Sequence, residues 1–174
     1  MIQTIPGTLL DIAIPTNPTA YAVDGSNNLQ ICSPETGGNI ITKAITGLPA
    51  VASNEGIDFR PVNGQLNAIV NNSQLNTLNT SSGAATAVGS PFAPLMIGTD
   101  FGFDFNPTID RIRRVSNARQ NVRLIPITGA FTAVDINLNP GIPSVSAVAY
   151  TNNFAGTTTT GLYFIDHNSD KLFF

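Results

Sequence analysis

The chain repeats itself along its length, and the period of that repeat limits its fold more than any other feature. Residues 56–89 (GIDFRPVNGQLNAIVNNSQLNTLNTSSGAATAVG) align without a gap with residues 102–135 (GFDFNPTIDRIRRVSNARQNVRLIPITGAFTAVD), 46 positions further on. A third copy covers residues 147–174, and a fainter one covers residues 10–38. A period of about 45 residues falls within the range of β-propeller blades, so we expect each copy to form one small sheet.

Each copy has the pattern of short β-strands separated by turns. The two best copies share glycines, aspartates, prolines and apolar residues, namely Gly56 and Gly102, Asp58 and Asp104, Phe59 and Phe105, Pro61 and Pro107, Gly83 and Gly129, and Val88 and Val134. In the second copy we expect strands at GFDF, DRIRRVS, NVRLIP and FTAVD, separated by the turn-type clusters NPTI, NARQ and ITG. Leu66, Ala68 and Val70 alternate with period two, and no window has a helical period.

We therefore predict an all-β fold, a β-propeller-like array of about four four-stranded repeats of about 45 residues, the last one incomplete. The repeats cover approximately residues 10–55, 56–101, 102–146 and 147–174, within a single domain 1–174. The last copy stops before its fourth strand. A strand from residues 2–10 could complete the ring; without it, the open sheet edge is a template for another chain.

The chain has few charged residues, which limits the classes of molecule that it is expected to bind. Only 11% of the residues are charged, the net charge is −3, and Lys43 and Lys171 are the only lysines. This balance gives no electrostatic reason to expect nucleic acid or an anionic membrane surface as a partner. No run approaches 18 apolar residues, so we expect no membrane span. The N-terminal segment lacks a signal-peptide pattern, which leaves a cytoplasmic protein or one whose signal has been removed.

The central copy and its flanks resemble a known family. The runs GFDFNPTIDRIRRVS, QNVRL and TGAFTAVD, with TSSGAATAVGSPF before them and AVAYTNNFAGTTTTGLYFID after them, are similar to DUF4394, bacterial domains of unknown function. The resemblance covers roughly residues 20–174 and implies a propeller-like all-β domain in exported proteins, with no catalytic residues to carry over. It also implies about one more repeat than this chain has and an apolar residue in place of Arg114. We therefore expect assembly with other subunits and an altered surface or interface at Arg114.

One dense charge cluster lies in this sparsely charged chain. Five of its eight basic residues lie between positions 111 and 123. Strands joined through NARQ would place Arg113 or Arg111 beside Arg123, and like charges opposite one another are destabilising unless acids or an anion intervene. Arg114 does not fit the period-two alternation of apolar and polar residues in this strand. We therefore expect it at a solvent-exposed edge or at a bulge.

Two hypotheses account for this cluster. In the structural hypothesis, Asp104 and Asp110 supply the acids, and Asp58, Asp104 and Asp110 are scaffold residues that tie strand to strand through arginine forks. In the functional hypothesis, Asp104, Arg111, Arg113 and Arg123 bind a phosphate, a sulfate or an acidic sugar. Asp58 and Asp104 recur at the same repeat position, which favours the structural hypothesis.

Support for catalysis or a bound metal is slight. The single histidine, His167, follows Asp166 in the turn IDHNSD, and adjacent residues on a strand point to opposite faces. The chain has no GxSxG elbow, and DHNSD lacks the order, the glycine and the glutamate of an EF-hand loop. Cys32 has no second cysteine and is expected to be a small buried residue on a strand. We expect no catalytic residue, metal or cofactor.

Two functions from different classes remain open. The first is a non-enzymatic structural or adhesive module, extracellular or at the cell surface, that pairs with itself or another protein through an open sheet edge. The second is a binding module for an anion or a carbohydrate, or an uncharacterised enzyme, with the Asp/Arg cluster as the polar wall of a cavity. Low charge, abundant Asn and Thr, and the incomplete last repeat favour the first.

Overall fold

The structure of the protein, a computed structural model, describes residues 19–35, 41–139 and 141–174. Within these ranges the chain forms antiparallel β-strands and no helix, which confirms the all-β prediction. The strands are β1 (Ala20–Val23), β2 (Asn28–Cys32), β3 (Ile41–Ala44), β4 (Asn54–Arg60), β5 (Gln65–Val70), β6 (Leu75–Leu78), β7 (Ala85–Val88), β8 (Phe101–Asn106), β9 (Arg111–Ser116), β10 (Asn121–Leu124), β11 (Phe131–Val134), β12 (Val145–Tyr150), β13 (Leu162–Asp166) and β14 (Lys171–Phe173). None of the described residues lies in a helix long and apolar enough to cross a membrane.

Each sheet is a meander of strands that follow one another in the sequence. The four sheets are β1–β3, β4–β7, β8–β11 and β12–β14. The second and third sheets are the two copies that align without a gap, and both have the four strands expected. The first and last sheets have three strands each among the described residues. Residues 2–10, the segment considered for a further strand, lie outside the described residues.

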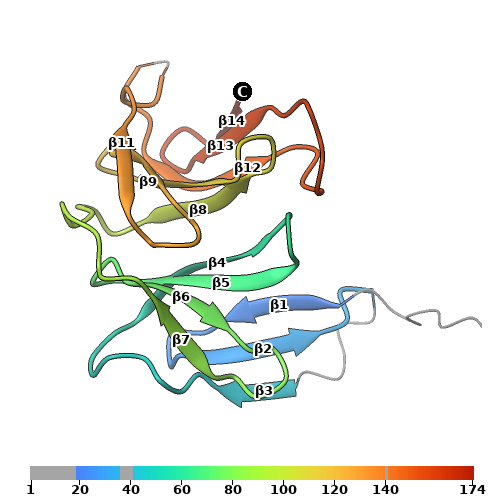
Figure 1. Ribbon diagram of the computed structural model, residues 1–174. Helices are drawn as coiled ribbons and strands as arrows, with labels where there is room; N and C mark the ends of the chain where they lie inside the picture. The colour runs from blue at the N-terminus through green and yellow to red at the C-terminus, as the bar shows by residue number, and fades with distance from the viewer. Residues whose placement is uncertain (1–18, 36–40, 140) are drawn as a thin grey trace, which may run out of the picture.

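In Figure 1 the β1–β3 sheet lies at the bottom, the β4–β7 sheet above it, and the β8–β11 and β12–β14 sheets in the upper part. The first strand of each sheet contacts the first strand of the next, so that β4 lies against β1 and β8, and β8 lies against β4 and β12. Sheets covered on both faces need apolar residues on both faces. This explains why β5 is nearly continuous in apolar residues: Leu66, Ala68, Ile69 and Val70 are all buried.

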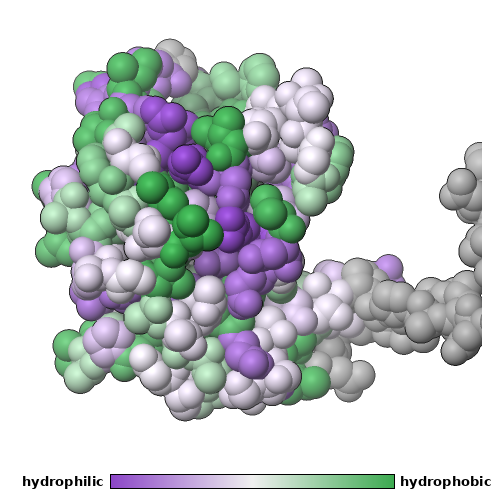
Figure 2. Space-filling view, in the orientation of Figure 1, coloured by the Kyte–Doolittle hydropathy of each residue, from purple (hydrophilic) through white to green (hydrophobic). Residues whose placement is uncertain are grey.

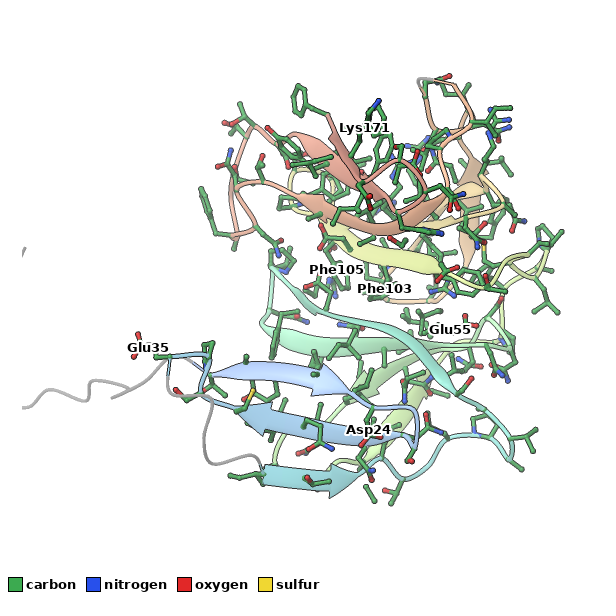
Figure 3. All side chains as sticks on the ribbon, turned by 180° about the vertical axis from the view of Figure 1, so that it is seen from behind. Asp24, Glu35, Glu55, Phe103, Phe105 and Lys171 are labelled. Carbon is green, nitrogen blue, oxygen red and sulfur yellow. The ribbon has the colours of Figure 1, made fainter. Side chains whose placement is uncertain are left out.

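Three apolar clusters fill the spaces between successive sheets. They pair Leu29 with Leu66, Ala68 and Leu78; Ile69 and Leu75 with Phe103, Phe105 and Ile112; and Val115 with Val145 and Phe164. Figure 3 shows Phe103 and Phe105 between β8 and the β4–β5 hairpin. Burying aromatic and branched side chains of this size is the main term that holds one sheet on the next.

Recurring glycines mark the places where successive sheets come closest. Gly83 and Gly129 hold the same repeat position, with φ angles of 80° and 68°. A Cβ atom at either would lie 2.5 Å from a main-chain oxygen of the preceding sheet, that of Ala44 for Gly83 and that of Val88 for Gly129. Only glycine combines a left-handed backbone with so close an approach.

The surface mixes polar side chains with exposed apolar ones. On the face in Figure 2, hydrophilic residues form a band down the middle, with hydrophobic residues on both sides. Val51, Ile136 and Ile142 are among the exposed apolar side chains. Single exposed side chains of this kind are normal on a soluble surface, whereas several on one sheet face are informative.

Candidate functional site

The charged run at residues 102–116 is divided by the alternation of its two strands. β8 and β9 pair so that Asp104 lies opposite Arg113 and Phe103 opposite Arg114. Opposite partners share a face, so Arg113 and Arg114 point to different sides of the sheet. Arg113 reaches Tyr150 in the fourth sheet, and Arg114 reaches Glu55 in the second. The run therefore contributes to two spaces between sheets and not to one site.

Arg113 and Arg123 lie together between the third and fourth sheets, in a cluster with Asp135, Asn121 and Tyr150. Arg113 is opposite Arg123 in the register of β9 and β10. Asp135 forms ion pairs with both, the one with Arg123 at 2.6 Å. Arg113 also donates to Oδ1 of Asn121 at 2.6 Å and to the hydroxyl of Tyr150 at 3.0 Å. One carboxylate thus neutralises two guanidinium groups that face each other.

The acid between the arginines is Asp135, so the expectation that Asp104 and Asp110 supply it is wrong. Sequence reasoning missed Asp135, although the repeat contained a signal for it. Three neutral residues of the first aligned copy are replaced by charges in the second, at a constant offset: Asn67 by Arg113, Thr77 by Arg123, and Gly89 by Asp135. Charges that occur together in one copy only indicate that they compensate one another.

Asp58 and Asp104 form a second polar group, on the first strands of the second and third sheets. Asp58 accepts a hydrogen bond from the N–H of Phe105 at 3.0 Å, and Asp104 accepts one from the N–H of Tyr150. Each carboxyl therefore ties its strand to the first strand of the next sheet, which gives a physical reason for the recurrence. Burial, with the hydrogen bond and the charge of Asp58, raises the pKa of Asp104 to about 8. Asp104 is thus protonated at neutral pH.

Asp110 and Arg111 lie at the turn between β8 and β9, apart from the Arg113–Arg123 pair. Asp110 accepts from Nε of Arg60 at 2.8 Å and forms an ion pair with it, between the second and third sheets. Arg111 donates to the main-chain oxygen of Asp110 at 2.8 Å. Of the four residues expected to bind a ligand, the structure brings Arg113 and Arg123 together, with Asp104 opposite Arg113 in the ladder.

Arg114 is buried in the middle of the ladder, so its expected place at a wet edge or a bulge is wrong. Its side chain is 1% exposed, and the register continues through it without a shift. Glu55 of β4 binds it, and the ring of Phe101 lies 4.5 Å from its guanidinium carbon. Figure 3 shows Glu55 at the level of the space between β8 and the β4–β5 hairpin. At Arg114 both faces of this sheet are covered, so its side chain meets another sheet rather than water.

The other candidate groups lie apart from these clusters. Nε2 of His167 is 3.3 Å from Oγ of Ser144 in an exposed position. Asp166 accepts the N–H groups of Ser144 and Asn168, so its carboxylate organises the turn. In the ranges that the structure describes, no three His, Cys, Asp or Glu side chains converge as metal ligands do. Cys32 lies half-buried on β2.

Replacing Asp135 with asparagine should lower the free energy of unfolding by about 1–3 kcal/mol, because Arg113 and Arg123 then face each other without a counter-charge. A dissolved divalent anion can take the place of the carboxylate. Sulfate should therefore restore more stability to this variant than chloride does at the same ionic strength. Urea unfolding followed by far-UV circular dichroism measures both effects.

The matched control for that experiment is Asp110→Asn, since Asp110 binds the single arginine Arg60. We expect a smaller recovery in sulfate for this control. An equal sulfate effect on Asp135→Asn, Asp110→Asn and the unmodified protein would show that the two arginines do not form an anion site when Asp135 is lost.

Comparison with known proteins supplies a family and no activity. A family model described as a domain of unknown function, DUF4394, matches residues 28–174. No curated protein matches the chain. The matched residues contain every strand from β2 to β14, together with both polar clusters.

Proposed function

The chain belongs to the DUF4394 family, and from that premise we propose that it is a non-enzymatic, exported structural or adhesive module. In this proposal it assembles with itself or with other subunits. The observation that carries the proposal is a sheet edge: among the described residues, β14 pairs with one strand, β13. An unpaired edge offers a row of N–H and C=O groups to another chain.

The arrangement of the sheets supports the finer proposal of a propeller-like array. Each sheet is a meander, and its first strand contacts the first strand of the next sheet, as in consecutive blades. β1 and β12 lie at opposite ends of the series in Figure 1. In this proposal, a ring would close only with sheets from elsewhere in a longer protein or from another subunit.

The pairing within the polar clusters supports a structural role for these residues rather than a catalytic one. Arg113 and Arg123 are paired with Asp135, and Asp104 is bonded to Asp58 and to the main chain of the next sheet. A general acid or base must be within reach of a substrate proton, and a nucleophile needs an adjacent base. These side chains instead have partners inside the fold.

Export is the part of the proposal that rests on the resemblance to DUF4394 domains, which implies an exported protein. The composition, with 11% charged residues and abundant Asn and Thr, is compatible with it. Fractionation of the source cells, with an antibody against the full chain, tests it. Confinement of the protein to the cytoplasmic fraction would contradict export and leave the assembly proposal standing.

Static light scattering across a dilution series tests assembly directly. We expect an average mass above the 18.3 kDa of one chain, falling toward that value as the protein is diluted. A mass of one chain at every concentration would contradict self-association.

A second candidate, carbohydrate binding, is favoured by one hollow. It has a volume of about 460 Å³, lies between the segment after β11 and the start of β13, and is lined in part by Asn121, Asn137, Asn139, Thr160 and Phe174. Amide and hydroxyl groups beside an aromatic ring suit the polar and apolar sides of a sugar. Calorimetric titration of the monomeric protein with oligosaccharides tests this candidate function. The absence of saturable heat would contradict carbohydrate binding.

A further inference from the structure

The segments that lead into β4, β8 and β12 each expose one aliphatic side chain at the same repeat position. The three residues are Val51, Ile97 and Ile142, and their exposed fractions are 100%, 68% and 80%. We call them the aliphatic row. The strands that follow them lie side by side, and in Figure 1 the chain enters these strands from the left. The row therefore lies along one end of the series of sheets.

The fold does not require an aliphatic residue at this position. Hydrogen bonds two residues further on fix the segments: the N–H of Ser53 donates to Oδ1 of Asn71 at 3.3 Å, and that of Thr99 to Oδ1 of Asn117 at 3.1 Å. Neither bond involves a side chain of the row. A single exposed aliphatic residue is normal, but its recurrence in three successive repeats of a chain rich in Asn, Ser and Thr indicates a surface that is used.

The backbone of Val51 supports the same conclusion. Its φ angle is 59°, in the left-handed region, which is unfavourable for a β-branched residue. Glycine takes this conformation without strain, as Gly83 and Gly129 do elsewhere in the chain. Valine gives no advantage to the backbone here, so its side chain is what this position supplies.

A hollow of about 270 Å³ lies beside Val51. Its walls are apolar side chains from the segments before β4 and β8 and two amide side chains from the turn between β5 and β6, namely Ala50, Val51, Ala52, Leu95, Asn71 and Asn72. None of these lining residues is charged. The sheets before and after the β4–β7 sheet are both described, so the hollow does not depend on where the chain ends.

The two amides contribute hydrogen-bond donors to this hollow. Oδ1 of Asn71 accepts the N–H of Ser53, and Oδ1 of Asn72 accepts the N–H of Gln74 at 3.1 Å. These bonds identify the oxygen of each amide, and within the described part of the chain the Nδ2 groups have no acceptor. A ligand that satisfies both amides must therefore bring acceptors.

We propose that this hollow binds an aliphatic side chain of an extended, uncharged peptide, whose main-chain carbonyl groups accept hydrogen bonds from Asn71 and Asn72. A peptide has a carbonyl acceptor on each side of every side chain, which matches two donors beside an apolar hollow. The peptide then continues along the aliphatic row toward Ile97. The inference goes beyond the proposed assembly, because it requires neither the edge of β14 nor a second copy of this chain.

Other ligands match this hollow less well. A sugar packs its apolar side on an aromatic ring, and none of the described residues that line the hollow is aromatic. An anionic lipid surface attracts basic side chains, and the same lining has none. The uncharged, donor-bearing wall therefore favours a peptide.

Nuclear magnetic resonance of the isotope-labelled full chain tests the binding. The probe is the blocked peptide acetyl-Gly-Leu-Ser-Leu-Gly-amide, and the control peptide has serine at both leucine positions. We expect the side-chain NH₂ signals of Asn71 and Asn72 to shift in a saturable way with the leucine peptide, with a dissociation constant of roughly 0.1–1 mM. The control peptide should leave them in place. Unchanged signals of both residues at about 5 mM leucine peptide would overturn the inference.

Two variants distinguish a binding role from a structural one. Leu95→Asn and Val51→Gly each remove an apolar wall, so we expect the dissociation constant to rise at least about tenfold. Val51→Gly should also melt at the same temperature as the unmodified protein or higher, because glycine accepts the φ angle of this position. Ile127→Asn is the matched control, since Ile127 is 69% exposed in the turn between β10 and β11 and does not line the hollow. It should leave the dissociation constant unchanged.

The possible results also separate this inference from the proposed assembly. If Val51→Gly lowers the melting temperature and binds the peptide normally, the valine is structural and the inference is overturned. Peptide-induced shifts confined to other residues, such as those of β14, overturn it as well. Light scattering of the unmodified protein without peptide measures self-association, and its result does not depend on either outcome.

Discussion

Replacing Glu55 with alanine should lower the free energy of unfolding by about 3–5 kcal/mol, the usual effect of leaving a buried charge without its partner. The partner is Arg114, whose side chain is 1% exposed between the second and third sheets, whereas that of Glu55 is 19% exposed. Burial lowers the pKa of Arg114 to about 10 against the attraction of Glu55. Without Glu55, the guanidinium keeps its desolvation penalty and loses the attraction.

The same pair should be replaceable by apolar residues. Nε and Nη1 of Arg114 have no hydrogen-bond partner in the part of the chain that the structure describes, so the guanidinium is incompletely satisfied. Burial also raises the pKa of Glu55, against the opposing effect of Arg114. We therefore expect the double variant Glu55→Leu with Arg114→Leu to lie within about 1–2 kcal/mol of the unmodified protein, or above it.

Urea unfolding followed by far-UV circular dichroism suits these variants, because the chain has no tryptophan. Asp110→Ala is the control: its ion pair with Arg60 is more open, with side chains 29% and 14% exposed, and its loss should have an effect of about 1 kcal/mol. Equal losses for Glu55→Ala and Asp110→Ala, or a double variant as unstable as Glu55→Ala, would contradict the role assigned to buried charge.

The sequence predicted the elements that depend on local pattern. The runs GFDF, DRIRRVS, NVRLIP and FTAVD correspond to β8, β9, β10 and β11, because turn residues and alternating apolar residues are local signals. The recurrence of Gly83 and Gly129 is likewise explained by one repeated contact with the preceding sheet. Repetition makes such signals stronger, because the same contact between sheets selects the same residue in both copies.

The ion pairs could not be predicted in the same way. Glu55 and Arg114 are far apart in the chain and meet only because one sheet lies on the next. Alternation of apolar and polar residues predicts burial only where one face of the sheet is exposed to solvent. In a sheet covered on both faces, it does not predict whether Arg114 is buried or exposed. Comparing the two aligned copies could have identified Asp135 as a charge that occurs together with Arg113 and Arg123. Its role as their shared partner could not be predicted, because it depends on the register that sets Arg113 opposite Arg123.

Asp104→Asn should make the protein more stable at alkaline pH, by roughly 3–6 kcal/mol at pH 9. The pKa of Asp104 is about 8 in the folded chain, whereas the ordinary value is 3.8. Between these values the folded chain binds a proton that the unfolded chain lacks. The contribution of Asp104 to stability is therefore fully present below about pH 4, falls as the pH rises, and is lost above about pH 8.

Asparagine reproduces the protonated carboxyl at every pH. Its amide can donate to Asp58, as the acid proton does, while its oxygen still accepts the N–H of Tyr150. The unfolding free energies of the variant and the unmodified protein should coincide near pH 4 and separate steadily up to pH 8. Urea unfolding at intervals from pH 4 to pH 9 measures that difference.

Asp24→Asn is the control of opposite sign. The hydrogen bonds of Asn28, with a further one from Gln30, lower the pKa of Asp24 to about 2 in an exposed turn. Asp24 therefore stabilises the folded chain above about pH 4, and this contribution disappears as the pH falls to about 2. Its replacement should lower stability at neutral and alkaline pH alike. A pH-independent difference for Asp104→Asn, or a variant less stable than the unmodified protein at pH 9, would mean that Asp104 is ionised in the folded chain and that burial does not raise its pKa.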